Sequence, residues 1–143
     1  MIFILHPCQL FSQIKADTIS IGENRIVLFY PSKSIVSMTN YEEGFFKDIS
    51  CIEDTAIIGL HYGDMVTIPL IDHPKKIVTN EYVLANLFRQ TRGFYYLDGV
   101  KKYFREDNIY KYGFNVYYTN VPERKLSFYE SLLNSLKFIE GKK

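Results

Sequence analysis

The sequence has no tryptophan, only two cysteines and no long apolar run. Cys8 and Cys51 lack the spacing and the companion cysteines of a disulfide framework, so we expect two buried thiols in a reducing compartment. No segment approaches the ~20 apolar residues that span a bilayer, and the opening residues lack the basic region of a secretory signal. We therefore expect a cytoplasmic protein that does not enter a membrane.

An excess of charge of one sign is also absent, since 17 basic and 16 acidic residues give a formal net charge of +1. This balance creates no overall field toward nucleic acid or anionic lipid, so we expect no nucleic-acid partner. What is present is an ordinary globular composition, 47% hydrophobic and 23% charged, which predicts a single domain over residues 1–143. Twelve tyrosines and eleven phenylalanines favour a fold that contains β-sheet.

The first half of the chain predicts strands with one short helix. β-Branched and aromatic runs between turn residues predict strands at residues 25–30, 55–62, 65–71 and 77–88. The last three are joined by short turns and therefore predict an antiparallel meander. Residues 34–50 predict mostly short helix, with Thr39 and Glu42 as a capping box.

In the second half the spacing of apolar residues changes. They recur every three or four positions over residues 91–106 and again over residues 123–136, which predicts two amphipathic helices. Alternation predicts a strand over residues 110–118, and residues 137–140 predict a last short strand. From residue 77 onward the expected order is therefore strand, helix, strand, helix, strand.

This order, over about residues 80–143, resembles the C-terminal half of the GNAT-family acyl-CoA N-acyltransferases. In that family a glycine-bearing loop lies between a strand and a helix, and the segment Gln90-Thr91-Arg92-Gly93 stands at the matching place. An Asn follows the next strand, here Asn120, and the last helix carries a Phe-Tyr-Glu segment, here residues 128–130. The resemblance implies an α+β fold with a mixed, mostly antiparallel sheet and helices on both faces.

The family binds its co-substrate acetyl-CoA at that loop. Backbone N–H groups at a helix N-terminus hold the pyrophosphate, because the helix dipole favours negative charge there. The loop here departs from the family's pattern, since only Gly93 of two glycines is present; the side chains of Arg89 and Arg92 either contact phosphate or form a solvated pair. The cofactor-binding residues that the resemblance implies are Leu87, Phe88, Arg89, Gln90, Arg92, Gly93, Phe94 and Asn120.

Two catalytic residues are implied in the same way. Tyr129 lies where the family often keeps a tyrosine that protonates the departing thiolate, and Glu81 lies near the place of a general base. The alternatives are a core aromatic for Tyr129 and a surface carboxylate for Glu81. Asn120 would contact the pantetheine arm, and it would equally suit a turn or the cap of the helix after Pro122.

The function implied is acetyl transfer from acetyl-CoA to a primary amine of a small molecule or peptide, by direct attack in a ternary complex. One alternative is a catalytically inactive binding or interaction protein of the same fold. A weaker alternative is a metal-dependent nucleic-acid enzyme, because the region around the predicted hairpin contains His61, Asp64, Asp72 and His73. Their spacing is not typical of metal ligands, so we predict no metal site. The sequence leaves open whether the chain forms a homodimer.

Overall fold

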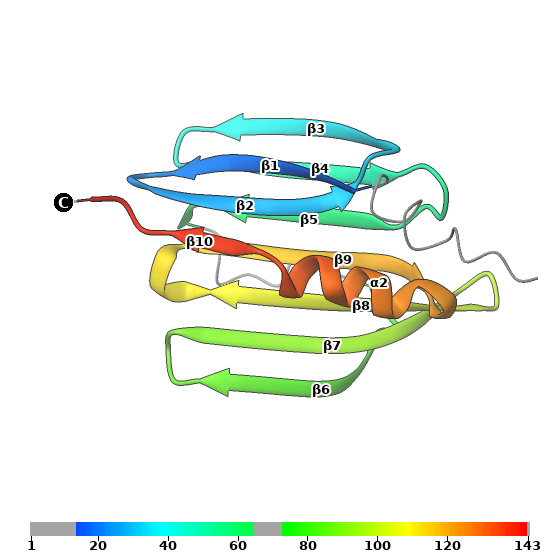
Figure 1. Ribbon diagram of the computed structural model, residues 1–143. Coiled ribbons are helices and arrows are strands. Elements are labelled where there is room, and N and C mark those ends of the chain that lie inside the picture. Colours follow the sequence, from blue (N-terminus) through cyan, green and yellow to red (C-terminus); the bar gives the residue numbers. More distant parts are fainter. Residues whose placement is uncertain (1–13, 65–72, 143) are drawn as a thin grey trace, which may run out of the picture.

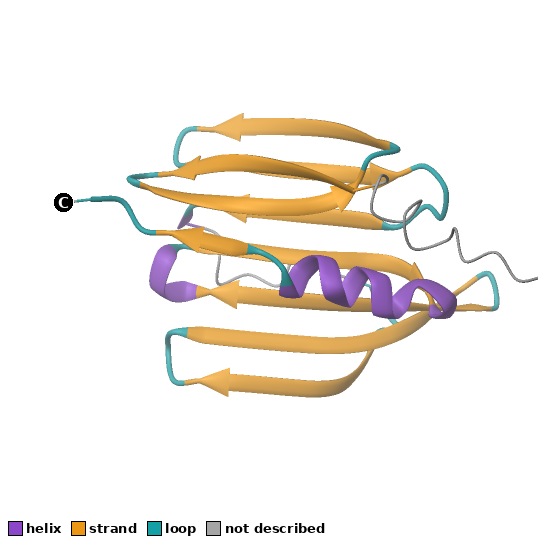
Figure 2. Cartoon of the chain, viewed as in Figure 1, coloured by secondary structure: helices purple, strands orange, loops and turns teal. Residues whose placement is uncertain are grey.

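The chain folds into two antiparallel β-sheets and one α-helix over residues 14–64 and 73–142, the part that the computed structural model describes. The larger sheet has seven strands in the order β3-β4-β5-β9-β8-β7-β6. The smaller sheet, in the order β1-β2-β10, and helix α2 form a second layer in front of the larger sheet (Figure 1). Strands therefore dominate both layers, as the colouring in Figure 2 shows.

The elements have the following bounds. The strands of the larger sheet are β3 (Ser34–Tyr41), β4 (Gly44–Cys51), β5 (Ile57–Tyr62), β6 (Ile77–Leu84), β7 (Phe88–Leu97), β8 (Val100–Ile109) and β9 (Phe114–Pro122). The smaller sheet contains β1 (Ile14–Ile21), β2 (Asn24–Pro31) and β10 (Lys137–Ile139). The helical segments are α2 (Leu126–Asn134) and the 3-10 turns η2 (Tyr110–Tyr112) and η3 (Glu123–Lys125).

The predicted α+β fold with helices on both faces is wrong. The described residues hold one α-helix, α2, which lies on one face of the larger sheet (Figure 1). Residues 91–106, predicted as a helix, belong to the hairpin of β7 and β8. Its turn is Asp98-Gly99, where both residues have positive φ (51° and 78°), as a type I′ hairpin turn requires and an α-helix does not allow. Apolar residues before and after this turn are three or four positions apart, which imitates a helical pattern.

Residues 34–50 also form a hairpin and not the predicted short helix. β3 and β4 pair in an unbroken register from Ser34 opposite Cys51 to Tyr41 opposite Gly44. The predicted capping box is absent, because Thr39 lies within β3 and Glu42 in the turn after it. Burial follows the period of two that a strand imposes, since every second residue near the end of β4 is buried.

The predicted meander of neighbouring strands is wrong as well. β5 pairs with β4 and β9, whereas β6 pairs with β7 at the far edge of the sheet. The strand predicted at residues 65–71 lies outside the described residues. Other local predictions are confirmed: the strand at residues 25–30, which is β2, the C-terminal helix and the last short strand.

The hydrophobic core lies between the two sheets and beneath α2. Most of its buried members are contributed by β2, β5, β9 and α2, and they include Ile26, Leu28, Ile58, Leu60, Val116, Tyr118, Tyr129, Leu132 and Leu133. In each strand these residues alternate with others that point to the opposite face, because successive side chains of a strand lie on opposite sides. Helix α2 supplies its buried side chains from one stripe, at positions three and four apart.

On the other face of the larger sheet, Gly59 makes room for an aromatic ring. Gly59 in β5 is the register partner of both Asp48 in β4 and Tyr117 in β9. A Cβ at position 59 would overlap the ring of Tyr117, whose hydroxyl donates to Asp48 at 3.2 Å. We expect Gly59→Ala to lower the free energy of unfolding by about 1–3 kcal/mol, because a packed, partly buried ring must move.

The measurement is urea unfolding of a double-mutant cycle with Tyr117→Ala. Once the ring is removed, Gly59→Ala should cost much less than in the parent protein. An equal cost in both backgrounds would show that the ring is not the reason for the glycine.

Candidate functional site

A groove of about 310 Å³ lies between the C-terminal end of α2, β10 and the strands β7, β8 and β9. We call it the helix-side groove. Its apolar wall includes Phe88, Tyr112, Phe114, Leu133, Leu136 and Phe138. Its polar groups are Gln90, Arg105, Asp107 and Asn134. A cleft of this size, mostly apolar with a few polar groups, is typical of ligand sites in proteins.

The groove forms because alternation places these side chains on one face. In β8, Arg105, Asp107 and Ile109 are two residues apart and therefore point toward α2. In β7, Phe88 and Gln90 share that face, since the register pairs them with Ile109 and Asp107. The floor is thus set by the strand pairing, and the last turn of α2 with β10 supplies the opposite wall.

Arg105 lies at the bottom of the groove, and its side chain is only 5% exposed. Its Nε and Nη2 donate to the Asp107 carboxylate, the latter at 2.7 Å, and its Nη1 donates to Glu130 and to Asn134 Oδ1. Burial alone would lower the pKa of Arg105, but Asp107 and Glu130 outweigh it and raise that pKa. The guanidinium therefore stays charged and joins β8 to α2.

Arg92 in β7 extends this ion network. Its Nε donates to Glu130 at 2.6 Å, and its Nη1 donates to Gln90 Oε1 at 2.6 Å. Burial would raise the pKa of Glu130, but the hydrogen bonds and charges of Arg92 and Arg105 hold it below its ordinary value of 4.5. Glu130 is therefore ionised at neutral pH and neutralised by two arginines.

The two arginines also fix the orientation of two amide side chains. A guanidinium only donates hydrogen bonds, so the amide atoms that face Arg92 and Arg105 must be the oxygens of Gln90 and Asn134. The NH₂ groups are the other ends of these amides, and neither donates to a group in the described part of the chain. The groove therefore presents two oriented amide donors beside an apolar wall.

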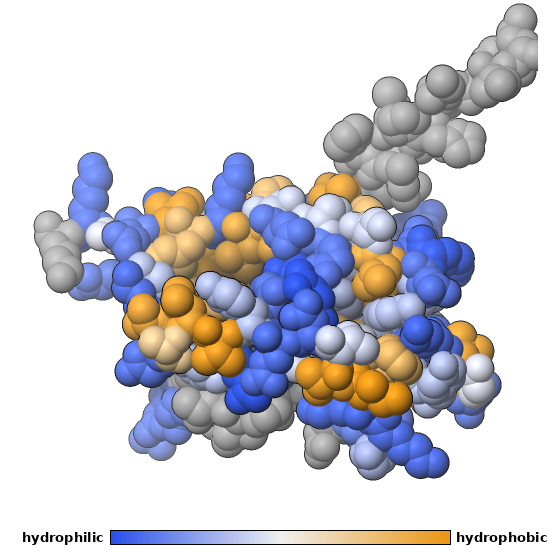
Figure 3. Space-filling model, turned by 90° about the horizontal axis from the view of Figure 1, so that it is seen from below, coloured by the Kyte–Doolittle hydropathy of each residue, from blue (hydrophilic) through white to orange (hydrophobic). Residues whose placement is uncertain are grey.

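Beyond the groove, the same face of the sheet continues as an exposed apolar strip. Leu84 and Tyr82 in β6 are register partners of Phe88 and Gln90, and they are 50% and 53% exposed. Figure 3, viewed from the β6 side, shows apolar groups gathered at both ends of this edge, with polar groups between them. An apolar surface thus leads from the groove to the edge strand.

Some of the residues predicted as cofactor-binding meet in this network, and others do not. Phe88 and Gln90 line the groove, and Arg92 contacts Glu130. Gly93 lies in the middle of β7, paired with Val78 and Phe104 on its two sides, so no helix begins there. A Cβ at Gly93 would overlap the backbone of β6.

The remaining predicted residues of this segment lie in other positions. Leu87 is in the β6–β7 turn, where its N–H donates to the carbonyl of Leu84. Phe94 lies in β7 beneath the ammonium of Lys101, 4.2 Å from the ring centroid. Arg89 and Glu81 form an exposed ion pair at 2.7 Å on the opposite face. None of these positions tests a role in acetyl-CoA binding, which stays a prediction.

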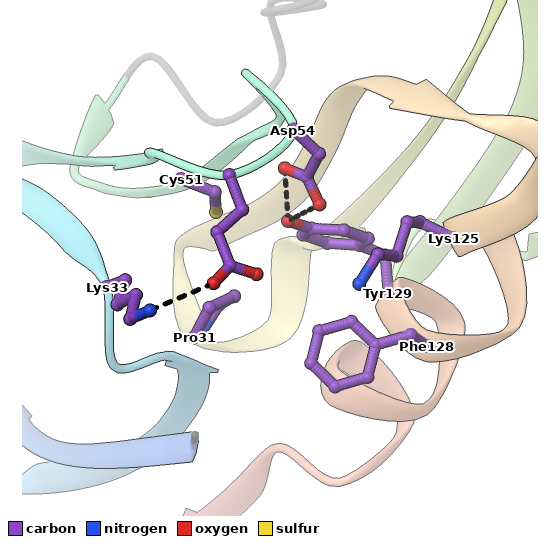
Figure 4. A pocket seen from close by; sticks show the side chains of 8 residues that line it. Pro31, Lys33, Cys51, Asp54, Lys125, Phe128 and Tyr129 are labelled. Atoms are coloured by element: carbon purple, nitrogen blue, oxygen red, sulfur yellow. Dashed lines mark hydrogen bonds and ion pairs between the residues drawn. The ribbon is translucent and has the colours of Figure 1, made fainter. Parts of the chain in front are cut away.

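Tyr129 and Asn120 come together at the loop between β4 and β5. Tyr129 is buried, and its hydroxyl donates to both carboxylate oxygens of Asp54, at 2.8 and 2.9 Å (Figure 4). Asn120 sits at a bulge of β9 with φ 58°, and its Nδ2 donates to the carbonyl of Thr55 at 2.9 Å. Asn is one of the few residues other than glycine that adopt this left-handed conformation, and here its side chain is held by Thr55 of the neighbouring loop.

The pocket beside Tyr129 is small. It is lined by Cys51, Asp54 and Phe128 among others, and its cavity volume of about 20 Å³ holds about one water molecule (Figure 4). Burial, the neighbouring Cys51 and Asp54 all raise the pKa of Tyr129 far above its ordinary value, so it is a neutral phenol. The predicted catalytic role of Tyr129 is not tested by these contacts.

On the opposite face of the larger sheet lies a second polar group. The Nε2 of His61 is 2.7 Å from the hydroxyl of Tyr41, and its ring stacks on Phe46. His61 Nδ1 and Asn115 Oδ1 are buried without a hydrogen-bond partner among the described residues. Burial lowers the pKa of His61, although the charge of Asp64 acts in the opposite direction. The imidazole is therefore neutral at pH 7.

Within residues 14–64 and 73–142, no group of three His, Cys, Asp or Glu side chains could hold a metal ion, and Asp72 lies outside the described residues. Nor does that part of the chain contain a helix long and apolar enough to cross a membrane.

No protein-family model, curated protein or solved structure matches this chain. Its function is therefore inferred from its own geometry.

Three residues of the groove were missed in the sequence: Arg105, Asp107 and Asn134. In a strand, Arg105 and Asp107 lie two apart on one face, which would have marked them as a pair. The helix predicted over residues 91–106 includes Arg105 but ends before Asp107, so the two were not recognised as neighbours on one face. Asn134 could not be found, because only the packing of α2 brings it to Arg105.

Removing Arg105 should be strongly destabilising. Arg105→Met leaves the Asp107 carboxylate buried and without its partner, so we expect the free energy of unfolding to fall by about 3–5 kcal/mol in urea titrations. The matched control is Arg89→Met, whose ion pair with Glu81 is exposed and should contribute at most about 1 kcal/mol. Similar losses for the two variants would contradict the role of the buried network.

Glu130 should make the free energy of unfolding depend on pH in the acid range. Its folded pKa lies below 4.5, so its contribution is fully present above the pKa of the unfolded chain and is lost as pH falls through the folded value. We expect the urea midpoint to fall between about pH 6 and about pH 3. In Glu130→Gln this part of the fall should be missing. An unchanged pH profile would show that other carboxylates cause the acid loss.

Proposed function

We propose that the chain is a binding protein whose helix-side groove takes an apolar side chain of an extended peptide segment, with the backbone carbonyls of that segment accepting hydrogen bonds from Gln90 and Asn134. This belongs to the class of binding or interaction proteins that the sequence left open as an alternative. It does not depend on a GNAT fold.

The observation that supports the proposal is the pair of oriented amides. Gln90 and Asn134 each commit their oxygen to an arginine and leave an NH₂ group at the groove. An NH₂ group that lines an apolar cleft favours a ligand that brings an acceptor, since an unmatched polar group loses hydrogen bonds to water when covered. Peptide carbonyls are neutral acceptors, which suits a site whose charges are already paired.

The surroundings of the groove favour a polypeptide over a small metabolite. The apolar strip formed by Phe88, Leu84 and Tyr82 leads out of the groove to the edge of the sheet. A small ligand would fill the groove and leave this strip uncovered. A peptide of several residues would cover both, and exposed apolar patches of this kind are typical of protein interaction sites.

Acetyl transfer from acetyl-CoA stays a prediction. The implied pyrophosphate site requires free backbone N–H groups at a helix N-terminus, whereas Gly93 lies inside β7 between two paired strands. A thermal shift with acetyl-CoA in large excess tests it directly, because a bound co-substrate raises the melting temperature.

The test of the proposed function is a titration of the ¹⁵N-labelled protein with N-acetyl-leucine amide, followed by NMR. We expect the side-chain NH₂ signals of Gln90 and Asn134 to move, with a Kd on the order of millimolar for so small a probe. The NH₂ group of Asn120 is an internal control, because it already donates to Thr55 and should not move.

Gln90→Met removes one donor while keeping the length of the side chain. We expect it to weaken probe binding by about five- to tenfold, the value of one hydrogen bond. Thr91→Met, on the opposite face of β7, is the matched control and should bind as the parent does. If the probe moves neither NH₂ signal, or if Gln90→Met binds it unchanged, the groove is not the binding site.

A further inference from the structure

The two sheets have four edge strands in the described part of the chain, and three of them are protected against pairing with another molecule. β1 carries Lys15 and Asp17, and β10 is three residues long. β6 carries Glu81, and its register with β7 shifts between Val78 and Asn80. Charges, short strands and bulges are the usual means by which edge strands avoid association.

β3 has none of these protections. Its sequence, Ser34–Tyr41, contains no charged residue and no proline, and its register with β4 is unbroken. Ile35, Val36 and Met38 are 64%, 42% and 47% exposed. An exposed apolar edge of this length offers a row of backbone N–H and C=O groups to another strand.

The backbone groups that β3 leaves free can be identified from its turn. Tyr41 and Gly44 close a two-residue turn and therefore form a hydrogen-bonded pair. Every second residue back from Tyr41 also bonds to β4. The outward-facing residues are those between them, namely Ser34, Val36, Met38 and Asn40.

We infer that β3 pairs antiparallel with β3 of a second copy of this chain, around a two-fold axis that passes beside Ser37. An axis perpendicular to the sheet keeps each face on its own side, so residues of the same face must oppose one another. Centring on Ser37 places Val36 opposite Met38, so that exposed apolar side chains meet. Centring on Met38 instead would place Val36 opposite the amide of Asn40.

The outward backbone groups match in this register. Val36 and Met38 both face outward and form a hydrogen-bonded pair twice across the axis, as do Ser34 and Asn40. Ile35 opposes Thr39 on the other face, a pair of β-branched residues that suits a sheet. The strand is therefore complementary to itself over its whole length, without an unmatched charge.

Charges at the ends of the strand agree with the same register. The pairing brings Lys33 of one copy opposite Tyr41 of the second copy and next to its Glu42. Lys33 is largely exposed, and within residues 14–64 and 73–142 the one ion pair of its ammonium is with Glu53, at 3.4 Å. The two-fold axis repeats this approach of opposite charges at the other end. Pairing with β6 has no such match, because Glu81 there is already bound to Arg89.

The experiment is sedimentation velocity of the full chain from about 1 to about 200 μM. We expect a monomer–dimer equilibrium with a Kd on the order of 10 μM, because an edge-to-edge contact of eight residues is small. Ser37→Lys places two like charges against each other on the axis and should raise the Kd at least about tenfold. Val83→Lys, at an exposed position of β6, is the matched control and should leave the Kd unchanged.

The register is tested by cross-linking in a Cys8→Ser background. Opposite residues of a non-hydrogen-bonded pair are about 4.5 Å apart at Cα, which a disulfide can bridge. Ser37→Cys should therefore give a disulfide-linked dimer on mild oxidation, while Ile35→Cys should not, because residue 35 opposes residue 39. A monomer at every concentration, a dimer that Ser37→Lys leaves intact, or cross-linking through position 35 in place of 37 would overturn the inference.

Discussion

The arrangement of the two layers depends on one buried cation. Arg105 lies on β8 within the larger sheet, and a charge so far from water is tolerated only when its donors are matched. Asp107 on the same strand supplies part of the match, and α2 supplies the rest through Glu130 and Asn134. These two residues are one helical turn apart, so a slide of α2 by a residue would withdraw both acceptors. The apolar core alone would specify this position less strictly, because apolar contacts have little directionality.

The two edges of the larger sheet differ, because the ion network lies near only one of them. On the β7 side, Arg92 and Arg105 hold α2 over the inner strands, and the face of β6 beyond them stays bare. On the other side, β3 ends the sheet with an uncharged edge. The groove and this edge lie at opposite ends of the strand order. A pair of chains joined through β3 would therefore present two grooves on the same face of one continuous sheet, far apart on either side of the axis, a geometry suited to a partner with repeated segments.

Local turns and the last amphipathic helix could be predicted from the sequence, because their signals lie within a few residues. The end of β2 at Pro31 and the stripe of Tyr129, Leu132 and Leu133 in α2 are examples. The fold class could not be predicted correctly, because the apolar spacing over residues 91–106 indicates a helix that runs through Asp98-Gly99. That turn decides whether these residues form one helix or two strands. The resemblance to an acyltransferase depended on that helix.

The candidate site was predictable only in part. Gln90, Arg92 and Phe88 were named, but for contact with a cofactor in a loop and not as neighbours on one face of a strand. Arg105 and Asp107 needed the correct period, and Asn134 needed the tertiary packing of α2. A period of two and a period of 3.6 give similar apolar spacing over short windows, so the sequence alone did not separate them.

The joint between β5 and β9 has a consequence for how the chain reaches its final form. Strands β3 to β5 and strands β6 to β9 each pair with their sequence neighbours, whereas Ile58 in β5 meets Tyr118 in β9 across a long stretch of chain. Local pairings form early because they close short loops, and a distant pairing closes last. During synthesis, the edge of β5 that pairs with β9 therefore stays unpaired until β9 leaves the ribosome. That interval is when the nascent chain is most exposed to aggregation and most in need of a chaperone.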